Sequence, residues 1–193
     1  MTVETTEKEV MCRVIEVSDG STRTKELIRP VPVKDGYLDW ESSEYCLIAV
    51  FERHGKMEYR LRSCDWRFNK KGAIATTYAH DHHNLMVIGK TAVDIIKAAN
   101  RIIEIQGGIC VVENENILAE VELPVVEYYQ KKSVEELGKE VEKLRGTMKA
   151  LGYKHYNPIM SLCTLSLPVS PALKITDKGL IDVAESKVVS LIV

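Results

Sequence analysis

Residues 72–123 carry the clearest secondary-structure signals in the chain and read GAIATTYAHDHHNLMVIGKTAVDIIKAANRIIEIQGGICVVENENILAEVEL. Two apolar runs, at 72–79 and 85–89, have the length and continuity of buried strands. A helix is predicted to begin after Thr91, because Asp94 follows at the spacing of a capping box. Further apolar runs at 109–113 and 117–123 predict a hairpin that turns around 114–116. The predicted helix ends at Gly107-Gly108. The residues of its one apolar face are Ile95, Ile96, Ala99, Ile102 and Ile103.

A second helix is predicted after Ser133, with Glu136 again at the capping-box position. Its apolar residues follow the three-four spacing of a helix that lies on a sheet, and they are Val134, Leu137, Val141, Leu144, Met148 and Leu151. The other predicted strands are 11–17, 45–51, 162–167 and 188–193, whereas 18–44 is expected to form turns with short strands. We therefore expect an α+β fold, a mixed β-sheet with at least two helices packed on it. Residues 1–9 are expected to fray, and 10–193 to form a single domain.

Charge and composition exclude several functional classes. The 193 residues carry 26 Lys and Arg against 28 Asp and Glu, a balance that creates no field for nucleic acid or an anionic membrane. No apolar run approaches the roughly 20 residues of a membrane-spanning helix, and the first residues lack the pattern of a secretion signal. We expect a cytoplasmic protein with no nucleic-acid or membrane partner. The five cysteines are scattered, and Cys46, Cys110 and Cys163 lie in apolar runs as core residues do.

Three of the five histidines, His80, His82 and His83, lie between the two strands of 72–89, together with Asp81 and Asn84. Imidazole and carboxylate groups together can bind a divalent metal, relay a proton or hydrogen-bond a purine edge. The alternative is a polar loop at a strand end, in which Asp81 orients one histidine and the others are solvated. A closed zinc site is not expected, because no Cys or Glu stands at ligand spacing nearby.

Glu52, Arg53 and His54 directly follow the predicted strand 45–51 and form a second candidate group. Charged residues in this position often form only the solvated rim of a sheet. If the two strands are neighbours, however, these three side chains converge with His80 and His83.

Three separated segments resemble one known family. They are GAIATTYAHDHHNLMVIG (72–89), AANRIIEIQGGICVV (98–112) and PIMSLCTLSLPVSPALKITDKGLIDV (158–183). Together they closely resemble the C-terminal region of bacterial and archaeal adenine deaminases, over about residues 10–193. The family motif resembles His-Asp-small-His-Asn, which carries over to His80, Asp81, His83 and Asn84, whereas His82 departs from it by replacing the small residue.

In this family the region follows an amidohydrolase barrel that holds metal ions and hydrolyses adenine to hypoxanthine and ammonia. A barrel of that kind needs roughly 200–250 residues, and its metal ligands have no counterparts here. The resemblance therefore implies an accessory module of purine salvage that docks on a separately encoded barrel or on another copy of itself. In that case Glu52, Arg53, His54, His80, Asp81, His83 and Asn84 line the shared cleft.

Two alternatives stay open. The first is an independent metal-dependent deaminase or hydrolase, in which His80, His82 and His83 recruit a divalent ion such as Mn, Fe or Zn. The second is a non-catalytic domain that binds a purine through Tyr78, His83 and Asn84. The preferred hypothesis expects no metal bound by this chain itself. It allows a divalent metal supplied by a partner barrel, a small-molecule purine as ligand, and a homo-oligomer.

Overall fold

The structure, a computed structural model, describes residues 2–53, 55, 59–65, 71–124 and 132–193. His54, one of the candidate residues, lies outside the described residues. Along the chain the elements are β1 (Glu9–Val17), β2 (Thr24–Lys34), β3 (Tyr37–Leu38), β4 (Cys46–Phe51), β5 (Tyr59–Asp65), β6 (Ala73–Thr76), β7 (Leu85–Gly89), α1 (Ala92–Glu104), β8 (Gly108–Glu113), β9 (Asn116–Glu122), α2 (Val134–Ala150), α3 (Pro158–Cys163), β10 (Leu173–Thr176), β11 (Gly179–Asp182) and β12 (Lys187–Val189).

Nine strands form one sheet in the order β3-β2-β1-β5-β4-β7-β6-β8-β9. Its paired strands are antiparallel except for β1 and β5, which are parallel. The strands β10, β11 and β12 form a second, antiparallel sheet. Strands of both orientations and separate helices make this an α+β fold with a mixed sheet, so the predicted fold class is confirmed.

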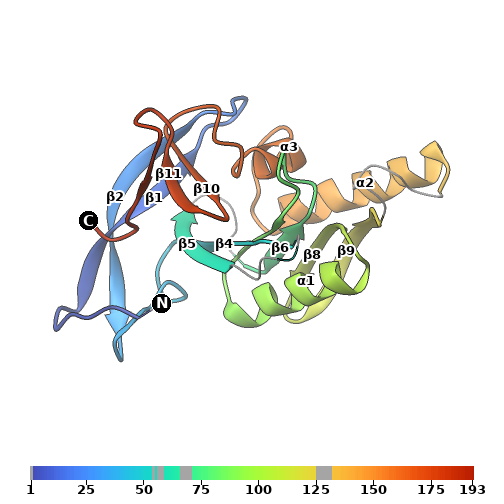
Figure 1. The fold of residues 1–193 in the computed structure, drawn as a ribbon. Helices are drawn as coiled ribbons and strands as arrows, with labels where there is room; N and C mark the ends of the chain where they lie inside the picture. Colours follow the sequence, from blue (N-terminus) through green and yellow to red (C-terminus); the bar gives the residue numbers. More distant parts are fainter. Residues whose placement is uncertain (1, 54, 56–58, 66–70, 125–131) are drawn as a thin grey trace.

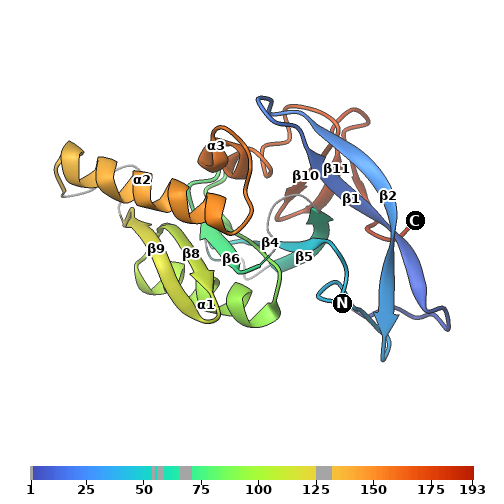
Figure 2. The same ribbon diagram turned by 180° about the vertical axis from the view of Figure 1, so that it is seen from behind.

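Helices cover both faces of the large sheet, with α1 on one side and α2 and α3 on the other (Figure 1). The view from behind shows α2 lying across β8 and β9 (Figure 2). Side chains alternate between the faces of a strand, and β6 shows the resulting division: Ala73 and Ala75 pack with α1, whereas Ile74 packs with α2 and α3. The sheet therefore separates two hydrophobic cores.

Both long helices begin where the sequence predicts. The Thr91 hydroxyl accepts the N–H of Asp94 at 3.3 Å and caps α1. Ser133 and Glu136 form a complete capping box at the start of α2, with each side chain accepting the other residue's N–H. These caps satisfy N–H groups that a helix start would otherwise leave without partners.

The predicted apolar faces of the helices are only partly buried. In α1, Ile95, Ala99 and Ile102 are buried, but Ile96 and Ile103 are 59% and 58% exposed. In α2, Leu144 and Met148 are fully buried, whereas Val134 at the first turn is 82% exposed. A sheet contacts a helix along one stripe only, and the apolar surface of α1 is wider than that stripe.

The hairpin of β8 and β9 turns at Asn114 and Glu115, as predicted. Both residues lie in the left-handed region, with φ of 50° and 62°, which a tight two-residue hairpin turn requires. At the other end of the hairpin Gly108 has φ +141°, and a Cβ atom there would lie 2.1 Å from the Val121 carbonyl oxygen. Only glycine permits the two strands to approach this closely.

Two expectations were wrong. The segment 18–44 contains an eleven-residue strand, β2, whose residues Thr24 to Pro32 pair with the whole of β1. Pro30 is tolerated because, in the described structure, the partners on the outer side of β2 lie near its two ends, at Thr24 and at 32–34, and leave Pro30 at an open stretch between them. The run 162–167, predicted as a strand, instead contains the end of helix α3.

The start of α3 explains the second difference. The Asn157 side chain accepts the N–H of Met160, and Pro158 occupies the first turn, where its missing N–H costs nothing. A cap followed by proline is a stronger signal than a short apolar run, which fits a strand or a buried helix equally well. Of the predicted strand 188–193, the structure forms β12 and an isolated bridge between Ile192 and Cys12.

Buried thiols and one buried lysine are notable in the core. Cys46, Cys110 and Cys163 are fully buried, as predicted, and burial raises the pKa of Cys110 to about 12. Lys174 is only 1% exposed, and its ammonium donates to the carbonyl oxygens of Thr22 and Thr164. Burial lowers the pKa of Lys174 to about 8. In the described part of the chain, no helix has the length and apolar character needed to cross a membrane.

Candidate functional site

The two candidate groups lie at the same end of the large sheet. Strand β4 runs antiparallel to β7, with Phe51 opposite Leu85, and β6 pairs with β7 on its other side. The residues that follow β4 and the loop that joins β6 to β7 therefore lie at the same end of these strands. This loop, residues 77–84, is called the histidine loop below.

Backbone contacts hold the histidine loop against β8. The N–H of Thr77 donates to the Gly108 carbonyl oxygen at 3.0 Å, and the Thr77 hydroxyl accepts the N–H of Gly108 at 2.9 Å. Within the loop, the N–H of His83 donates to the Ala79 carbonyl oxygen, and His83 takes a left-handed conformation with φ of 50°. An extended loop would have placed His80 and His82 on one side; these contacts instead fold the loop back on itself.

The three histidines have different surroundings. The His80 ring meets the Tyr78 ring edge-on, with centroids 5.3 Å apart, and both are half-buried. His82 Nδ1 accepts the N–H of Asn84 at 2.9 Å, which fixes a neutral imidazole with its proton on Nε2. Burial lowers the pKa of His82 below its usual value, although the carboxylate of Asp177 opposes this effect. His82 therefore acts as a structural acceptor near neutral pH.

Asn84 and Ser166 are buried polar residues on the side of the sheet covered by α3. Asn84 is 3% exposed and Ser166 is fully buried. Among the described residues, none donates a hydrogen bond to Asn84 Oδ1, and none pairs with Ser166 Oγ. The backbone of Ser166 also interacts with His82. Sequence reasoning missed Ser166 and Asp177, because only the tertiary fold brings them to the histidine loop.

Arg53 lies on the other side, beside α1. It lines a cleft of about 220 Å³ together with Thr77, Leu85, Ile102, Ile103 and Gln106. Glu52 and Arg53 also line a larger, mainly apolar cleft of about 300 Å³ against α1. Among the described residues that line these two clefts, none belongs to 78–84. The structure thus brings the two candidate groups to the same end of the sheet, where Arg53 lines a cleft beside α1 together with Thr77, the first residue of the histidine loop.

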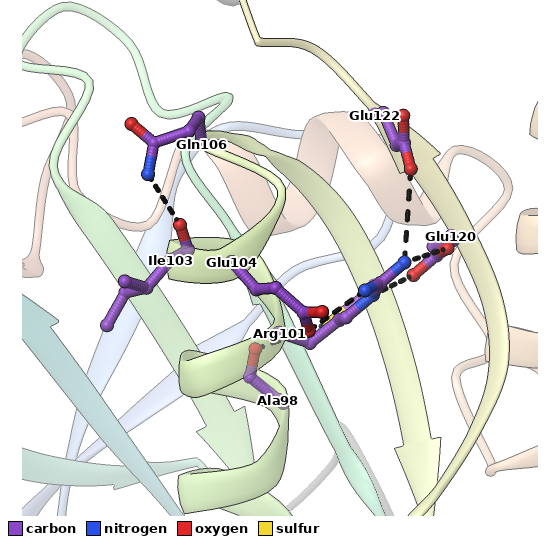
Figure 3. A network of polar contacts seen from close by, with 8 residues as sticks. Ala98, Arg101, Ile103, Glu104, Gln106, Glu120 and Glu122 are labelled. Atoms are coloured by element: carbon purple, nitrogen blue, oxygen red, sulfur yellow. Dashed lines mark hydrogen bonds and ion pairs between the residues drawn. The ribbon is translucent and has the colours of Figure 1, made fainter.

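An ion-pair network joins α1 to β9 (Figure 3). Arg101 reaches from α1 to β9 and makes two hydrogen bonds of 2.7 Å to the carboxylate of Glu120. It also contacts Glu104 at 2.9 Å, and Glu122 lies 3.9 Å away. The hydrogen bonds from Arg101 lower the pKa of Glu120. A bidentate pair of this kind is geometrically specific, so it holds α1 in a defined position on the sheet.

Among the described residues, the histidine loop does not supply three ligands for one metal ion. Nδ1 of His82 is already occupied by the N–H of Asn84. Across the part of the chain that the structure describes, no three His, Cys, Asp or Glu side chains are grouped so that they could hold one ion. A catalytic metal site generally needs three protein ligands with an open position.

Comparison with known proteins gives a consistent family. The family model of the adenine deaminase C-terminal domain matches residues 21–187. Adenine deaminase 2 of Shouchella clausii is 53% identical over 184 residues, which cover 95% of this chain and 32% of the relative. Adenine deaminase of Clostridium perfringens is 47% identical over 183 residues (94% and 32%). That of Thermosipho africanus is 39% identical over 182 residues (94% and 32%). The chain therefore belongs to the adenine deaminase C-terminal domain family and spans about a third of the length of these curated relatives.

Proposed function

We propose that this chain serves as the C-terminal module of an adenine deaminase and acts together with a catalytic part, rather than deaminating adenine by itself. One observation carries the proposal: 95% of the chain aligns with only 32% of an adenine deaminase at 53% identity. The roughly two thirds of the relative that lie outside the match have no equivalent here. In this proposal those residues supply the divalent metal and the activated water.

The histidine loop supports a role at the rim of an adenine site. Tyr78, His80 and His83 are half-buried and Asp81 is exposed, so a ligand or a covering segment can reach them. An aromatic ring and imidazole groups suit a purine, which needs a stacking face and a few hydrogen-bonding partners. Asn84 has a different role, because it is buried and holds His82 through its N–H.

A chimera tests the proposal. The C-terminal third of the Shouchella clausii enzyme is replaced by residues 1–193 of this chain, and adenine turnover is measured. We expect the chimera to keep activity within about tenfold of the parent, because the two domains are 53% identical. A correctly folded, metal-loaded chimera without measurable deamination would contradict the proposal.

A single substitution in the chimera tests the histidine loop. His83→Ala is expected to lower kcat/KM for adenine at least about tenfold, the order of effect of losing a positioned polar contact. Lys187→Ala is the control, since Lys187 is exposed and its ion pair with Glu185 lies on the surface. Equal activity of the two variants would remove the histidine loop from the adenine site. Calorimetry on the isolated chain distinguishes the purine-binding alternative, which requires adenine binding without turnover.

A further inference from the structure

Helix α1 presents an apolar stripe to solvent. Val93, Ile96 and Ile103 are 53%, 59% and 58% exposed, and their spacing places them on one side of the helix. Other exposed apolar residues of the described chain, such as Val169 and Val188, lie in separate segments. Single exposed apolar side chains are normal on a protein surface, but a grouped set marks an interaction site.

A groove lies beside this stripe. It is the cleft of about 300 Å³ between α1 and the adjoining ends of β4 and β7, and most of its lining is apolar: Phe51, Leu85, Ile95, Ile96, Ala99 and Ile103. Glu52, Arg53 and Asn100 supply its polar groups. Arg53, Leu85 and Ile103 also line the smaller cleft of about 220 Å³, so the two hollows adjoin. The groove and the stripe together are called the α1 face.

The α1 face is held in a fixed shape. Arg101 fastens the second half of α1 to Glu120 of β9. At the first turn the Glu41 carboxylate accepts the N–H of Ala92. The Cys110 thiol donates to the Ala98 carbonyl oxygen at 3.4 Å from the sheet beneath. A preformed surface loses little conformational freedom on binding, which favours a stable contact.

We infer that the α1 face is the surface on which the catalytic part of an adenine deaminase docks, an inference that rests on the proposed function. Roughly two thirds of each relative lies outside the region matched here, and the matched region is the C-terminal domain. That larger part therefore precedes the module.

The placement of the N-terminal residues supports this occupant. The Val3 side chain packs in the same core cluster as α1, together with Leu38 and Trp40. The N–H of Val3 donates to Gly36, and Glu41, which follows a few residues later, contacts the start of α1. A segment joined before Thr2 thus enters on the side of the sheet that carries the α1 face.

Docking here places the histidine loop at the boundary between the two parts. The groove lies at the end of the sheet where β4 ends and β7 begins, and the histidine loop connects to β7 at that end. The partner surface must offer apolar side chains for the stripe. The same contact would cover the apolar area and bring His83 close to a site built mainly by the catalytic part.

The chimera described above provides the test. Ile96→Glu combined with Ile103→Glu is compared with Val169→Glu combined with Val188→Glu, two exposed residues away from α1 (72% and 54% exposed). We expect the first pair to lower kcat/KM for adenine at least about tenfold and the second to leave it within about twofold. Hydrogen exchange on the unmodified proteins supplies a second readout: amides of 92–105 should be at least about tenfold better protected in the chimera than in the isolated chain.

The outcomes separate the two proposals. An active chimera with unchanged exchange at 92–105 and no effect of the isoleucine substitutions would overturn the docking face and leave the proposed function intact. An inactive unmodified chimera would instead count against the proposed function. If the isolated chain forms a dimer that the isoleucine substitutions dissolve, and 92–105 is no better protected in the chimera, the occupant is a second copy and the inference is wrong.

Discussion

Replacing Lys174 by methionine should remove a specific part of the pH dependence of stability. Lys174 is 1% exposed, and burial lowers its pKa from 10.5 to about 8. Its depressed pKa means that the folded state loses this proton at lower pH than the unfolded state. The favourable contribution is therefore fully present above the unfolded pKa of 10.5 and is lost as the pH falls through about 8.

The expected magnitude follows from the two pKa values. A folded-state pKa that differs by one from the unfolded-state pKa corresponds to about 1.4 kcal/mol. Between pH 7 and pH 10 the linkage gives roughly 2.5 kcal/mol of increased stability from this group. Raised thiol pKa values, such as that of Cys12, oppose this rise above about pH 9 in both proteins. The quantity to measure is therefore the difference in unfolding free energy between wild type and Lys174→Met.

Urea denaturation at pH 7, 8, 9 and 10 measures this difference directly. We expect the unfolding free energy of the wild type minus that of the variant to increase steadily from pH 7 to pH 10. At every pH the variant also loses the N–H groups of Lys174 that donate to the carbonyl oxygens of Thr22 and Thr164, which adds a cost of about 1–3 kcal/mol throughout the series. A difference that stays constant within about 0.5 kcal/mol from pH 7 to pH 10 would refute the reasoning, because it would mean that the buried amine titrates as in water.

Three further substitutions test the packing around the site. Arg101→Ala should destabilise the chain by about 1–3 kcal/mol in urea denaturation, since it removes two hydrogen bonds to a half-buried carboxylate. The control Arg145→Ala, at an exposed residue, should change stability by less than about 0.5 kcal/mol. Equal effects of the two substitutions would contradict a stabilising role of the Arg101–Glu120 pair. Thr77→Val should cost about 1–3 kcal/mol because the buried N–H of Gly108 loses its acceptor, and protection of that amide from hydrogen exchange should fall. Gly146→Ala should increase the free energy of unfolding by up to about 1 kcal/mol and so raise the melting temperature, because the residue lies inside α2 with open space around it. A lower melting temperature would contradict this.

Local signals made much of the fold predictable. The caps at Thr91 and Ser133 act within four residues, so the sequence alone identifies the starts of α1 and α2. The hairpin at Asn114 is equally local, because turn geometry depends on the two residues at its centre. In contrast, β2 depends on pairing with β1 rather than on its own sequence, and its two prolines led to the prediction of turns.

The site was less predictable, because it depends on which surfaces meet in the folded chain. Sequence adjacency identified the histidine loop, and the pairing of β4 with β7 shows that Arg53 reaches the same edge. Sequence adjacency could not show that Arg53 lines the α1 clefts or that the charge of Asp177 acts on His82, since the face on which a side chain lies depends on strand register. The exposure of Ile96 was missed for a related reason: periodicity gives the direction of an apolar stripe but not how much of it a neighbour covers.

Adenine turnover by the purified chain alone, measured beside the chimera with added Mn²⁺, Fe²⁺ or Zn²⁺, tests the assignment of this chain as a non-catalytic module most directly. We expect the chimera to form hypoxanthine and the isolated chain to stay at the background rate with each metal. Sustained hypoxanthine formation by the isolated chain that a chelator abolishes would contradict the assignment.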